Sequence, residues 1–297
     1  MRVFVTGATG FIGSLVVKDL IAAGHEVIGV YRSDEKAPAL AAAGAEAYRG
    51  SIDDPESLKE GAARSDGVIH LAFNHDFSKF MANCETDRHV IKALGSVLAG
   101  SHRPLIVTSG TAIAKVAPGQ PSTEDAPAVT SKDFPRAASE EAAADAAAGG
   151  INVSVVRLPQ VHDPARQGLI TPWIVTAREK GLFAYIGDGH NRWPAAHVSD
   201  VARLYRLALE KAESGAKYNA VAEEGVAARD IAETISRRLK LPVKSITPEE
   251  AEPYFGWLAH LAARDMPASS AQTRKKLDWQ PTGPGLLADL EQLQVSS

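Results

Sequence analysis

The sequence predicts an α/β protein in which a doubly wound parallel sheet is joined to a smaller, helix-rich C-terminal lobe. Three observations predict it. Short β-rich segments alternate with longer helical patterns over the first ninety residues, and repeated β-α units fold into parallel sheets through right-handed crossovers. Residues 166–195 and 223–297 are helix-rich instead, and all four tryptophans lie there. The length of 297 residues is enough for about two lobes.

The elements follow one another along the chain. Residues 3–5 form a strand, and apolar side chains recur at helical spacing over residues 11–23 until Gly24 ends the helix. At Asp54 an N-cap residue precedes a proline, which is typical of a first helical turn. Residues 114–135 form a long loop, which in a compact domain is often functional. The other predicted elements are strands at 26–30, 45–48, 68–71, 105–109 and 153–156 and helices at 39–43, 137–148 and 200–212.

A glycine-rich turn between the first strand and the first helix carries the clearest chemical signal. It reads Thr6, Gly7, Ala8, Thr9, Gly10, Phe11, Ile12 and Gly13. Gly7 permits the tight turn, Gly10 lets the backbone approach a pyrophosphate, and Gly13 allows the helix to pack closely on the sheet. The N–H groups at the start of the helix and its positive dipole end bind phosphates. The turn therefore predicts a dinucleotide site in a Rossmann fold.

The end of the second strand discriminates between the two nicotinamide dinucleotides. An acidic residue there favours NAD, whereas a basic residue accommodates the 2′-phosphate of NADP. Arg32 and Ser33 come before Asp34 in this chain, so we expect NADP to be preferred, with NAD as the other cofactor open to the site. The dinucleotide-binding domain is expected to span residues 1–165, joined by about 197–222, and the substrate lobe to comprise 166–196 and 223–297.

The composition argues against several other classes of protein. Lys and Arg number 32 against 36 Asp and Glu, and a formal charge of −4 argues against a nucleic-acid or anionic-membrane partner. The single cysteine, Cys84, excludes an internal disulfide framework, and no metal-ligand spacing is evident. We expect a cytoplasmic protein without a signal peptide or a transmembrane helix, because nowhere do 18 apolar residues run together.

Further segments resemble the short-chain dehydrogenase/reductase superfamily, in particular its extended, epimerase-like branch. The glycine turn is that branch's version of the motif, and the likeness runs along almost the full chain. The other matching segments are 66–72 (DGVIHLA), 157–159 (RLP), 187–189 (GDG), 197–202 (HVSDVA) and 279–281 (WQP). Beyond the glycine turn, the resemblance implies cofactor contacts from Arg32, Ser33, Asp53, Leu71, Ala72, Phe73, Arg136, Pro159 and Val161.

The reaction centre of that family is altered in this chain. The family uses a Ser together with a Tyr and a Lys four residues apart on one helix, and no Tyr-x-x-x-Lys lies near the relevant helix here. The family usually has a Glu four residues after the Lys and an Arg-Pro-type strand further on. Glu140 and Arg157 match both landmarks when Arg136 takes the Lys position and Lys132 the Tyr position.

The serine region is altered too. Gly110 stands where the family usually has its catalytic serine, so Ser109 and Thr111 are the candidate substitutes. Asp87 stands at a helix position where the family often has Asn. The resemblance therefore implies an atypical subgroup that keeps the cofactor site and lacks the Tyr/Lys pair.

Lys132 and Arg136 have properties that suit carbonyl chemistry. Hydride transfer to a carbonyl leaves an alkoxide, so the site needs a proton donor or a fixed positive charge. A free lysine has a pKa of about 10.4, close to about 10 for tyrosine, and a neighbouring cation lowers it. Lys132 is therefore a candidate acid, and Lys132→Met is expected to abolish turnover and spare cofactor binding. Arg136 can anchor ribose hydroxyls or stabilise an oxyanion. The alternative is that Lys132 faces solvent in the loop before the helix, because Pro135 is tolerated only in a first helical turn.

Other residues are weaker candidates for the site. His162 follows the sixth strand and is therefore a second candidate acid. The alternative for His162 is a packing role. Arg192 matches a family position that sometimes contacts a phosphate or sugar of the substrate. The expected walls of a pocket between the lobes are Phe73, Asn74, Trp173, Trp193, Phe255 and Trp257.

The leading interpretation is an NADP(H)-dependent oxidoreductase acting on a small carbonyl or alcohol. Two alternatives stay open: a nucleotide-sugar epimerase or dehydratase, and a redox sensor that binds NADP(H) without turnover. The family often dimerises through two helices of the first lobe, at positions 83–99 and 137–148 here, so a homodimer is a further expectation.

Overall fold

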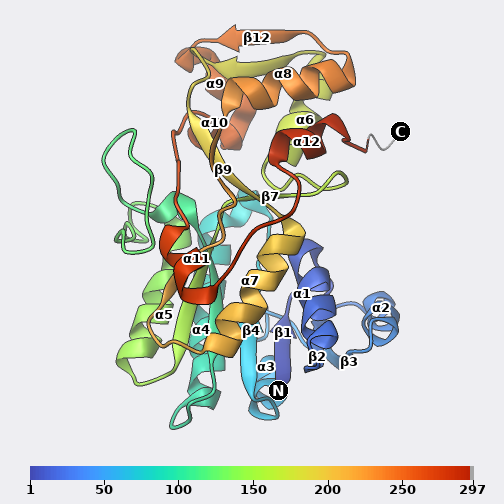
Figure 1. Cartoon of the computed structure of the whole chain (residues 1–297), viewed down its shortest axis with the longest axis vertical. Helices are drawn as coiled ribbons and strands as arrows, with labels where there is room; N and C mark the ends of the chain where they lie inside the picture. Colours follow the sequence, from blue (N-terminus) through green and yellow to red (C-terminus); the bar gives the residue numbers. More distant parts are fainter. Residues whose placement is uncertain (295–297) are drawn as a thin grey trace.

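The computed structural model describes residues 1–294 and contains two lobes (Figure 1). The larger lobe is built on a seven-stranded sheet with all neighbouring strands parallel and the order β10-β6-β5-β4-β1-β2-β3. The order reverses between β1 and β4, and open α/β sheets bind ligands beyond such a point. The strands are β1 (Arg2–Thr6), β2 (Glu26–Tyr31), β3 (Glu46–Arg49), β4 (Gly67–His70), β5 (Leu105–Gly110), β6 (Val153–Leu158) and β10 (Lys217–Asn219).

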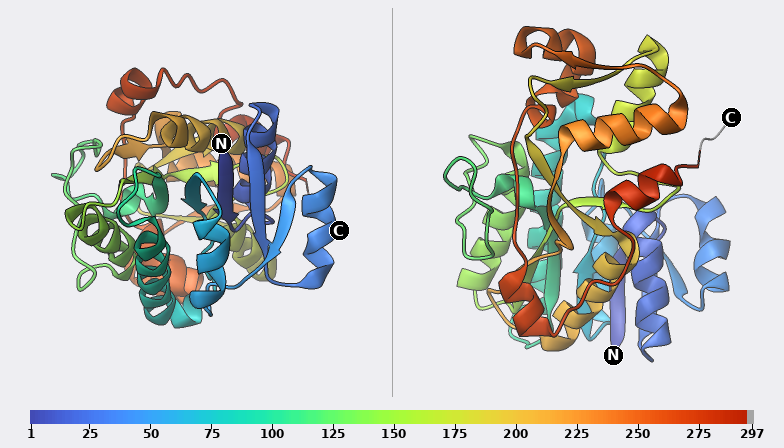
Figure 2. Two further views of the ribbon diagram at one scale, coloured as in Figure 1. Left: turned by 90° about the horizontal axis from the view of Figure 1, so that it is seen from below. Right: turned by 45° about the horizontal axis from the view of Figure 1, so that its top comes forward.

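Helices cover both faces of this sheet (Figure 2). On one face α1 (Phe11–Ala22) packs against α7 (Val198–Lys211). On the other face α4 (Phe80–Leu98) packs against α3 (Glu56–Ala63) and α5 (Ala138–Ala148). The short helix α2 (Ala37–Ala42) lies beside β3. The predicted doubly wound sheet is therefore confirmed.

The smaller lobe has its own apolar core, which is made of helices, one pair of parallel strands, and residues Trp193, Ala195 and Val226 of a second sheet. The helices are α6 (Ile170–Lys180), α8 (Ala228–Leu239), α9 (Pro248–Phe255), α10 (Ala259–Ala262) and α12 (Leu286–Glu291), and β8 (Phe183–Ile186) pairs in parallel with β12 (Val243–Ile246). A three-stranded sheet joins this lobe to the larger one. Its strands, in the order β11-β9-β7, are β11 (Glu223–Ala227), β9 (Arg192–His197) and β7 (Gln160–His162).

The segment from α11 (Ala271–Leu277) to Trp279 packs elsewhere than we expected. α11 contacts α7 and β10, and both Leu277 and Trp279 belong to the core of the larger lobe. The indole N–H of Trp279 donates to the backbone carbonyl of Asp200 at 2.9 Å. This segment therefore belongs with the dinucleotide lobe, although the expected division put it in the substrate lobe. The rest of that division stays a prediction.

The six predicted strands of the main sheet are all present, whereas β10 was not predicted. Residues 114–134 contain neither a helix nor a strand in the structure, and isolated bridges join Ala114 to Ala128 and Ser122 to Ala268. Within residues 1–294, no helix combines the length and the apolar character that crossing a membrane requires.

Candidate functional site

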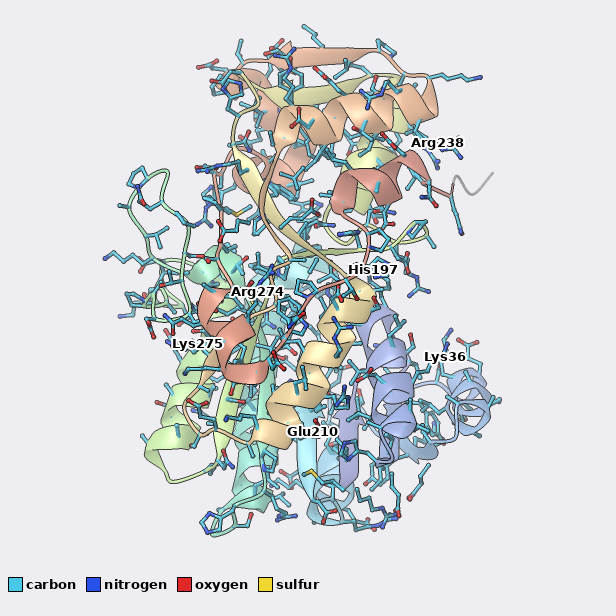
Figure 3. All side chains as sticks on the ribbon, in the orientation of Figure 1. Lys36, His197, Glu210, Arg238, Arg274 and Lys275 are labelled. Atoms are coloured by element: carbon cyan, nitrogen blue, oxygen red, sulfur yellow. The ribbon has the colours of Figure 1, made fainter. Side chains whose placement is uncertain are left out.

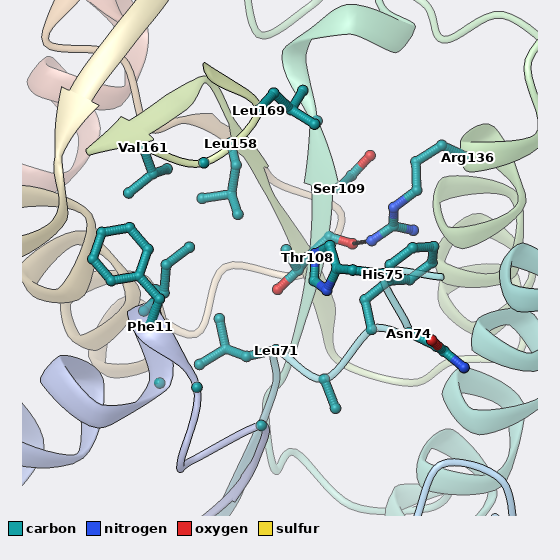
Figure 4. Close-up of a pocket in the computed structure, with 18 of the residues that line it drawn as sticks. Phe11, Leu71, Asn74, His75, Thr108, Ser109, Arg136, Leu158, Val161 and Leu169 are labelled. Atoms are coloured by element: carbon teal, nitrogen blue, oxygen red, sulfur yellow. Dashed lines mark hydrogen bonds between the residues drawn. The ribbon is translucent and has the colours of Figure 1, made fainter. Parts of the chain in front are cut away.

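A cavity of about 1000 Å³ lies beyond the carboxyl ends of the parallel strands, where both lobes line it (Figure 4). The ionisable side chains among the described residues that line it are Arg32, His75, Arg136 and Arg166, with neither a carboxylate nor a lysine. Most of the other lining residues are apolar. The cavity therefore suits a ligand that combines negative charge with an apolar or aromatic part.

The glycine turn has the geometry that its sequence predicts. Gly7 adopts a left-handed conformation with φ of 68°, and the N–H of Gly10 donates to the carbonyl of Gly7 at 2.9 Å. A Cβ atom on Gly13 would lie 2.0 Å from the carbonyl oxygen of Gly7, so only glycine fits there. No side chain caps the first turn of α1, and the residues of this turn line the cavity, so its N–H groups are available to a phosphate.

Most of the expected cofactor residues line the cavity. Those that do are Thr6, Gly7, Thr9, Gly10, Phe11, Ile12, Gly13, Arg32, Leu71, Ala72, Phe73, Arg136, Pro159 and Val161. Ser33 and Asp53 do not, and both are exposed. After β3 the chain presents Gly50, Ser51 and Ile52 to the cavity, and the turn directs Asp53 toward solvent.

Arg32 stands at the end of β2 with an exposed side chain. In the part of the chain that the structure describes, no carboxylate lies within ion-pair distance of its guanidinium. The neighbouring Asp34 pairs with Arg49 at 3.5 Å instead. Arg32 is therefore available for an anionic group of a ligand in the cavity.

Thr6 begins a chain of buried hydrogen bonds below the cavity. Its Oγ1 accepts the backbone N–H groups of Leu71 and Ala72, each at 3.2 Å, and lies 2.7 Å from Nδ1 of His70. Nε2 of His70 lies 3.0 Å from Oδ1 of Asp87. Because the hydroxyl already accepts two bonds, its own proton goes to Nδ1, and we infer that His70 donates from Nε2–H to Asp87.

Asp87 holds Arg136 at the edge of the cavity. Nη1 of Arg136 donates to Oδ2 of Asp87 at 3.0 Å, and Nη2 donates to the carbonyl of Thr108 at 3.0 Å. Burial by itself raises the pKa of Asp87, but Arg136 and the hydrogen bond from His70 outweigh burial and bring this pKa down to about 2. The charged carboxylate fixes the guanidinium, whose carbon lies 4.4 Å from the ring centroid of Phe73.

Ser109 faces the same side of the sheet as Arg136. It pairs in register with Arg157, whose guanidinium binds Glu140 of α5 through bonds of 2.7 and 2.9 Å, and Arg136 lies just before α5. Ser109 is one of the residues that line the cavity, and its hydroxyl is buried without a hydrogen-bond partner among residues 1–294. Buried polar atoms are rarely left without a partner, so this hydroxyl is a candidate for binding a ligand.

The contact between Glu140 and Arg157 also joins the two landmarks that located Arg136 from sequence. Thr111 lines the cavity as expected, but its hydroxyl donates to the carbonyl of Leu158 at 3.4 Å. Ser109 is therefore the hydroxyl better placed to bind a ligand.

Lys132 lies outside the cavity. Its side chain is exposed, and it is absent from the residues that line the site. Phe134 has an extended backbone with φ of −146°, and the helical turn begins only at Pro135. Lys132 is therefore not one helical turn before Arg136, and its expected role as proton donor has no support in this arrangement.

His162 also lies away from the cavity. It is fully buried, and its Nδ1 lies 2.7 Å from Oδ2 of Asp289 in α12. Burial lowers the pKa of His162 against the opposing effect of Asp289. The ring of His197 lies 5.9 Å away, centroid to centroid, at the junction of the two lobes (Figure 3). This group of side chains ties α12 to β7 and β9, which is a structural role.

The expected aromatic walls are partly correct. Phe73, Asn74 and Trp193 line the cavity. The other three do not: Trp173 and Phe255 are buried in the core of the smaller lobe, and Trp257 stacks on Phe77 with 4.1 Å between ring centroids. Arg192 does not line the cavity either, because Asp265 binds it at 2.7 Å.

Two ionisable residues of the cavity, His75 and Arg166, were not assigned a role from the sequence. His75 directly follows Asn74, and its place after β4 was the signal that could have identified it. Desolvation by its neighbours and the charge of Arg136 lower the pKa of His75, although part of the imidazole is open to solvent. The guanidinium carbon of Arg166 lies 5.7 Å from the ring centroid of Phe11, the first residue of α1. No cluster of metal-ligating side chains was found in residues 1–294.

The sheet order, the glycine turn and the cavity beyond the switch point define a dinucleotide-binding protein of the α/β class. The chain belongs to the NAD dependent epimerase/dehydratase family, which it matches over residues 3–221. It is 46% identical over 291 residues to an uncharacterized protein of Schizosaccharomyces pombe, with 98% of each chain covered.

Two solved structures show the same fold at low sequence identity. The human epimerase family protein solved with NADPH superimposes with a TM-score of 0.72 and 20% identity, covering 99% of both chains. The dTDP-glucose 4,6-dehydratase DesIV of Streptomyces venezuelae, solved with NAD, gives a TM-score of 0.75 and 20% identity, covering 99% of this chain and 95% of that one. The nicotinamide dinucleotides of these two structures thus differ.

Proposed function

We propose that this protein is an NADP(H)-dependent oxidoreductase that reduces a small carbonyl compound to an alcohol. The observation that carries the proposal is one continuous cavity. It runs from the glycine turn and Arg32 to Ser109, Arg136 and His75, and three arginines with no lining carboxylate give it positive charge.

The dinucleotide fits the chain's own residues along the first part of this cavity. The uncapped N-terminus of α1 would hold the pyrophosphate, and Arg32 would hold the 2′-phosphate that distinguishes NADP from NAD. Bound NADPH supplies a hydride to the carbonyl carbon of the substrate.

Ser109 and Arg136 bind the oxygen of that carbonyl. The unpartnered hydroxyl of Ser109 donates to it, and Arg136, fixed by Asp87, offers a positive charge on the same side of the sheet. As the carbonyl π electrons move onto the oxygen, both groups stabilise the developing negative charge. Arg136 cannot supply the proton, since arginine stays protonated in proteins.

His75 supplies the proton. Among the described residues that line the cavity, it is the one imidazole, the type of side chain that ordinarily titrates closest to neutral pH. The imidazolium gives its proton to the substrate oxygen and becomes neutral, and its open side regains a proton from solvent. Figure 4 shows His75 within the cavity together with Ser109 and Arg136.

Fluorescence and absorbance of NADPH test the proposal in two steps. Purified protein is titrated into NADPH, and a change in emission reports binding. Aldehydes, ketones and quinones are then added, and a saturable loss of absorbance reports turnover. We expect His75→Gln to bind NADPH normally and to lose turnover. Lys132→Met is the comparison, and a loss of turnover in that variant alone would contradict the role of His75.

The two alternatives predict different results in the same experiment. A redox sensor binds NADPH, and no carbonyl compound consumes it. A nucleotide-sugar epimerase or dehydratase also gives no net consumption, but it converts a nucleotide sugar with the dinucleotide bound. Arg192, the residue expected to contact a phosphate or sugar of the substrate, is bound by Asp265 and does not line the cavity, which favours the reductase.

A further inference from the structure

Four phenylalanines form a continuous surface on one side of the cavity, which we name the aromatic wall: Phe73, Phe77, Phe80 and Phe134. Phe80 lies at its centre, with ring centroids 6.4 Å from Phe73, 5.9 Å from Phe77 and 6.0 Å from Phe134. Tilted and edge-to-face rings at these distances attract one another, so the surface is preorganised.

The smaller lobe closes the other side with apolar side chains. Trp193 of β9, Leu261 of α10 and Met266 line the cavity there. The stack of Trp257 on Phe77 joins this lobe to the aromatic wall at its outer end. A ligand that reaches Ser109 therefore passes between apolar surfaces contributed by both lobes.

Polar side chains that could bind a sugar are scarce in this region. Of the lining residues described, none is Asp, Glu or Lys. Beside the aromatic wall the polar side chains are Asn74, His75 and Arg136, and the guanidinium of Arg136 is already bound by Asp87 and by the carbonyl of Thr108. A sugar would bury several hydroxyl groups here without partners, and each such group costs about 1–3 kcal/mol. A planar apolar group would instead gain from burial.

We infer that the substrate is an uncharged, planar aromatic aldehyde or ketone, whose ring packs on the aromatic wall while its carbonyl oxygen reaches Ser109. The inference rests on the proposed function and keeps its chemistry. The hydride adds to the carbonyl carbon, the π electron pair moves to oxygen, and the oxygen takes the proton of His75, which leaves an aromatic alcohol and oxidised NADP.

A matched pair of aldehydes tests the inference on the full-length protein with NADPH. We expect kcat/KM for 2-naphthaldehyde to exceed that for glyceraldehyde about 100-fold, because a naphthyl ring buries far more apolar surface. Phe80→Ala should raise KM for 2-naphthaldehyde about tenfold and leave the Kd of NADPH unchanged. Met81→Ala is the control, since Met81 is the next residue of α4 and is 73% exposed. Phe134→Ala serves as a second variant in case Phe80→Ala fails to fold.

The outcomes separate this inference from the proposed function. If glyceraldehyde is consumed as efficiently as 2-naphthaldehyde, or neither phenylalanine variant changes KM, the inference is overturned and the reductase remains. If NADPH binds but neither aldehyde is consumed, the proposed reductase fails. Calorimetric binding of 2-acetylnaphthalene to the NADPH complex then decides the inference: binding weakened by Phe80→Ala supports it, and no binding overturns it.

Discussion

Replacing Asp87 by Asn removes the buried charge that fixes Arg136. The pKa of Asp87 is about 2 in the folded chain against 3.8 for an ordinary Asp. A lowering of that size corresponds to about 2 kcal/mol of stability in the ionised state. We therefore expect Asp87→Asn to lower the free energy of unfolding at pH 7 by about 2 kcal/mol. Urea denaturation followed by tryptophan fluorescence measures it.

The sign of the pH dependence makes this prediction specific. Because folding lowers the pKa of Asp87, its stabilisation is complete above the unfolded pKa and is lost as the pH falls through 3.8 toward about 2. Roughly half of that contribution, about 1 kcal/mol, should be lost at pH 3. The difference in stability between wild type and Asp87→Asn should narrow by that amount from pH 6 to pH 3. A difference that stays constant over this range refutes the reasoning.

Four further predictions address the cofactor, the proton and the core. Arg32→Ala should raise the Kd of NADPH about tenfold or more and leave the Kd of NADH unchanged. A titration in which the variant loses affinity for both dinucleotides equally would contradict this. Gly13→Ala should abolish NADPH binding in the same titration, because its Cβ would lie 2.0 Å from a backbone carbonyl oxygen of the turn. For reduction, kcat/KM should fall as the pH rises through the lowered pKa of His75, and His75→Gln should flatten the profile. Arg157→Met leaves Glu140 charged and buried, so the free energy of unfolding from urea denaturation should drop by about 3 kcal/mol; a change below 1 kcal/mol would count against it.

The parts of the fold that depend on local patterns could be predicted from sequence. Strands and helices of the first lobe follow from apolar periodicity, and the glycine turn from the space available at Gly7 and Gly13. β10 was missed because a three-residue strand gives no periodic signal, and its place is fixed by pairing with β6. The place of Trp279 was missed for a related reason, since only tertiary contacts assign its indole to the larger lobe.

The chemistry was harder to predict than the cofactor turn. Spacing put Lys132 one helical turn before Arg136, but Pro135 begins the helical turn too late for the two to share it. His75 belongs to no periodic element, so sequence gave it no role, and only the path of the chain after β4 brings it into the cavity. Arg136 was located by its spacing from two landmarks, Glu140 and Arg157, and these two residues contact each other in the fold.

The return of α11 and Trp279 to the larger lobe has a consequence for how the two lobes can come apart. Beyond β6 the backbone enters the smaller lobe, comes back through α7, leaves again at α8, comes back at α11 and finally reaches α12. A protease that cuts the chain once between the lobes therefore leaves two fragments, at least one of which contributes to both lobes. Shortening the chain before α11 would also remove an indole from the centre of the other lobe. The two lobes are thus not separable modules, and neither can be excised as one continuous stretch.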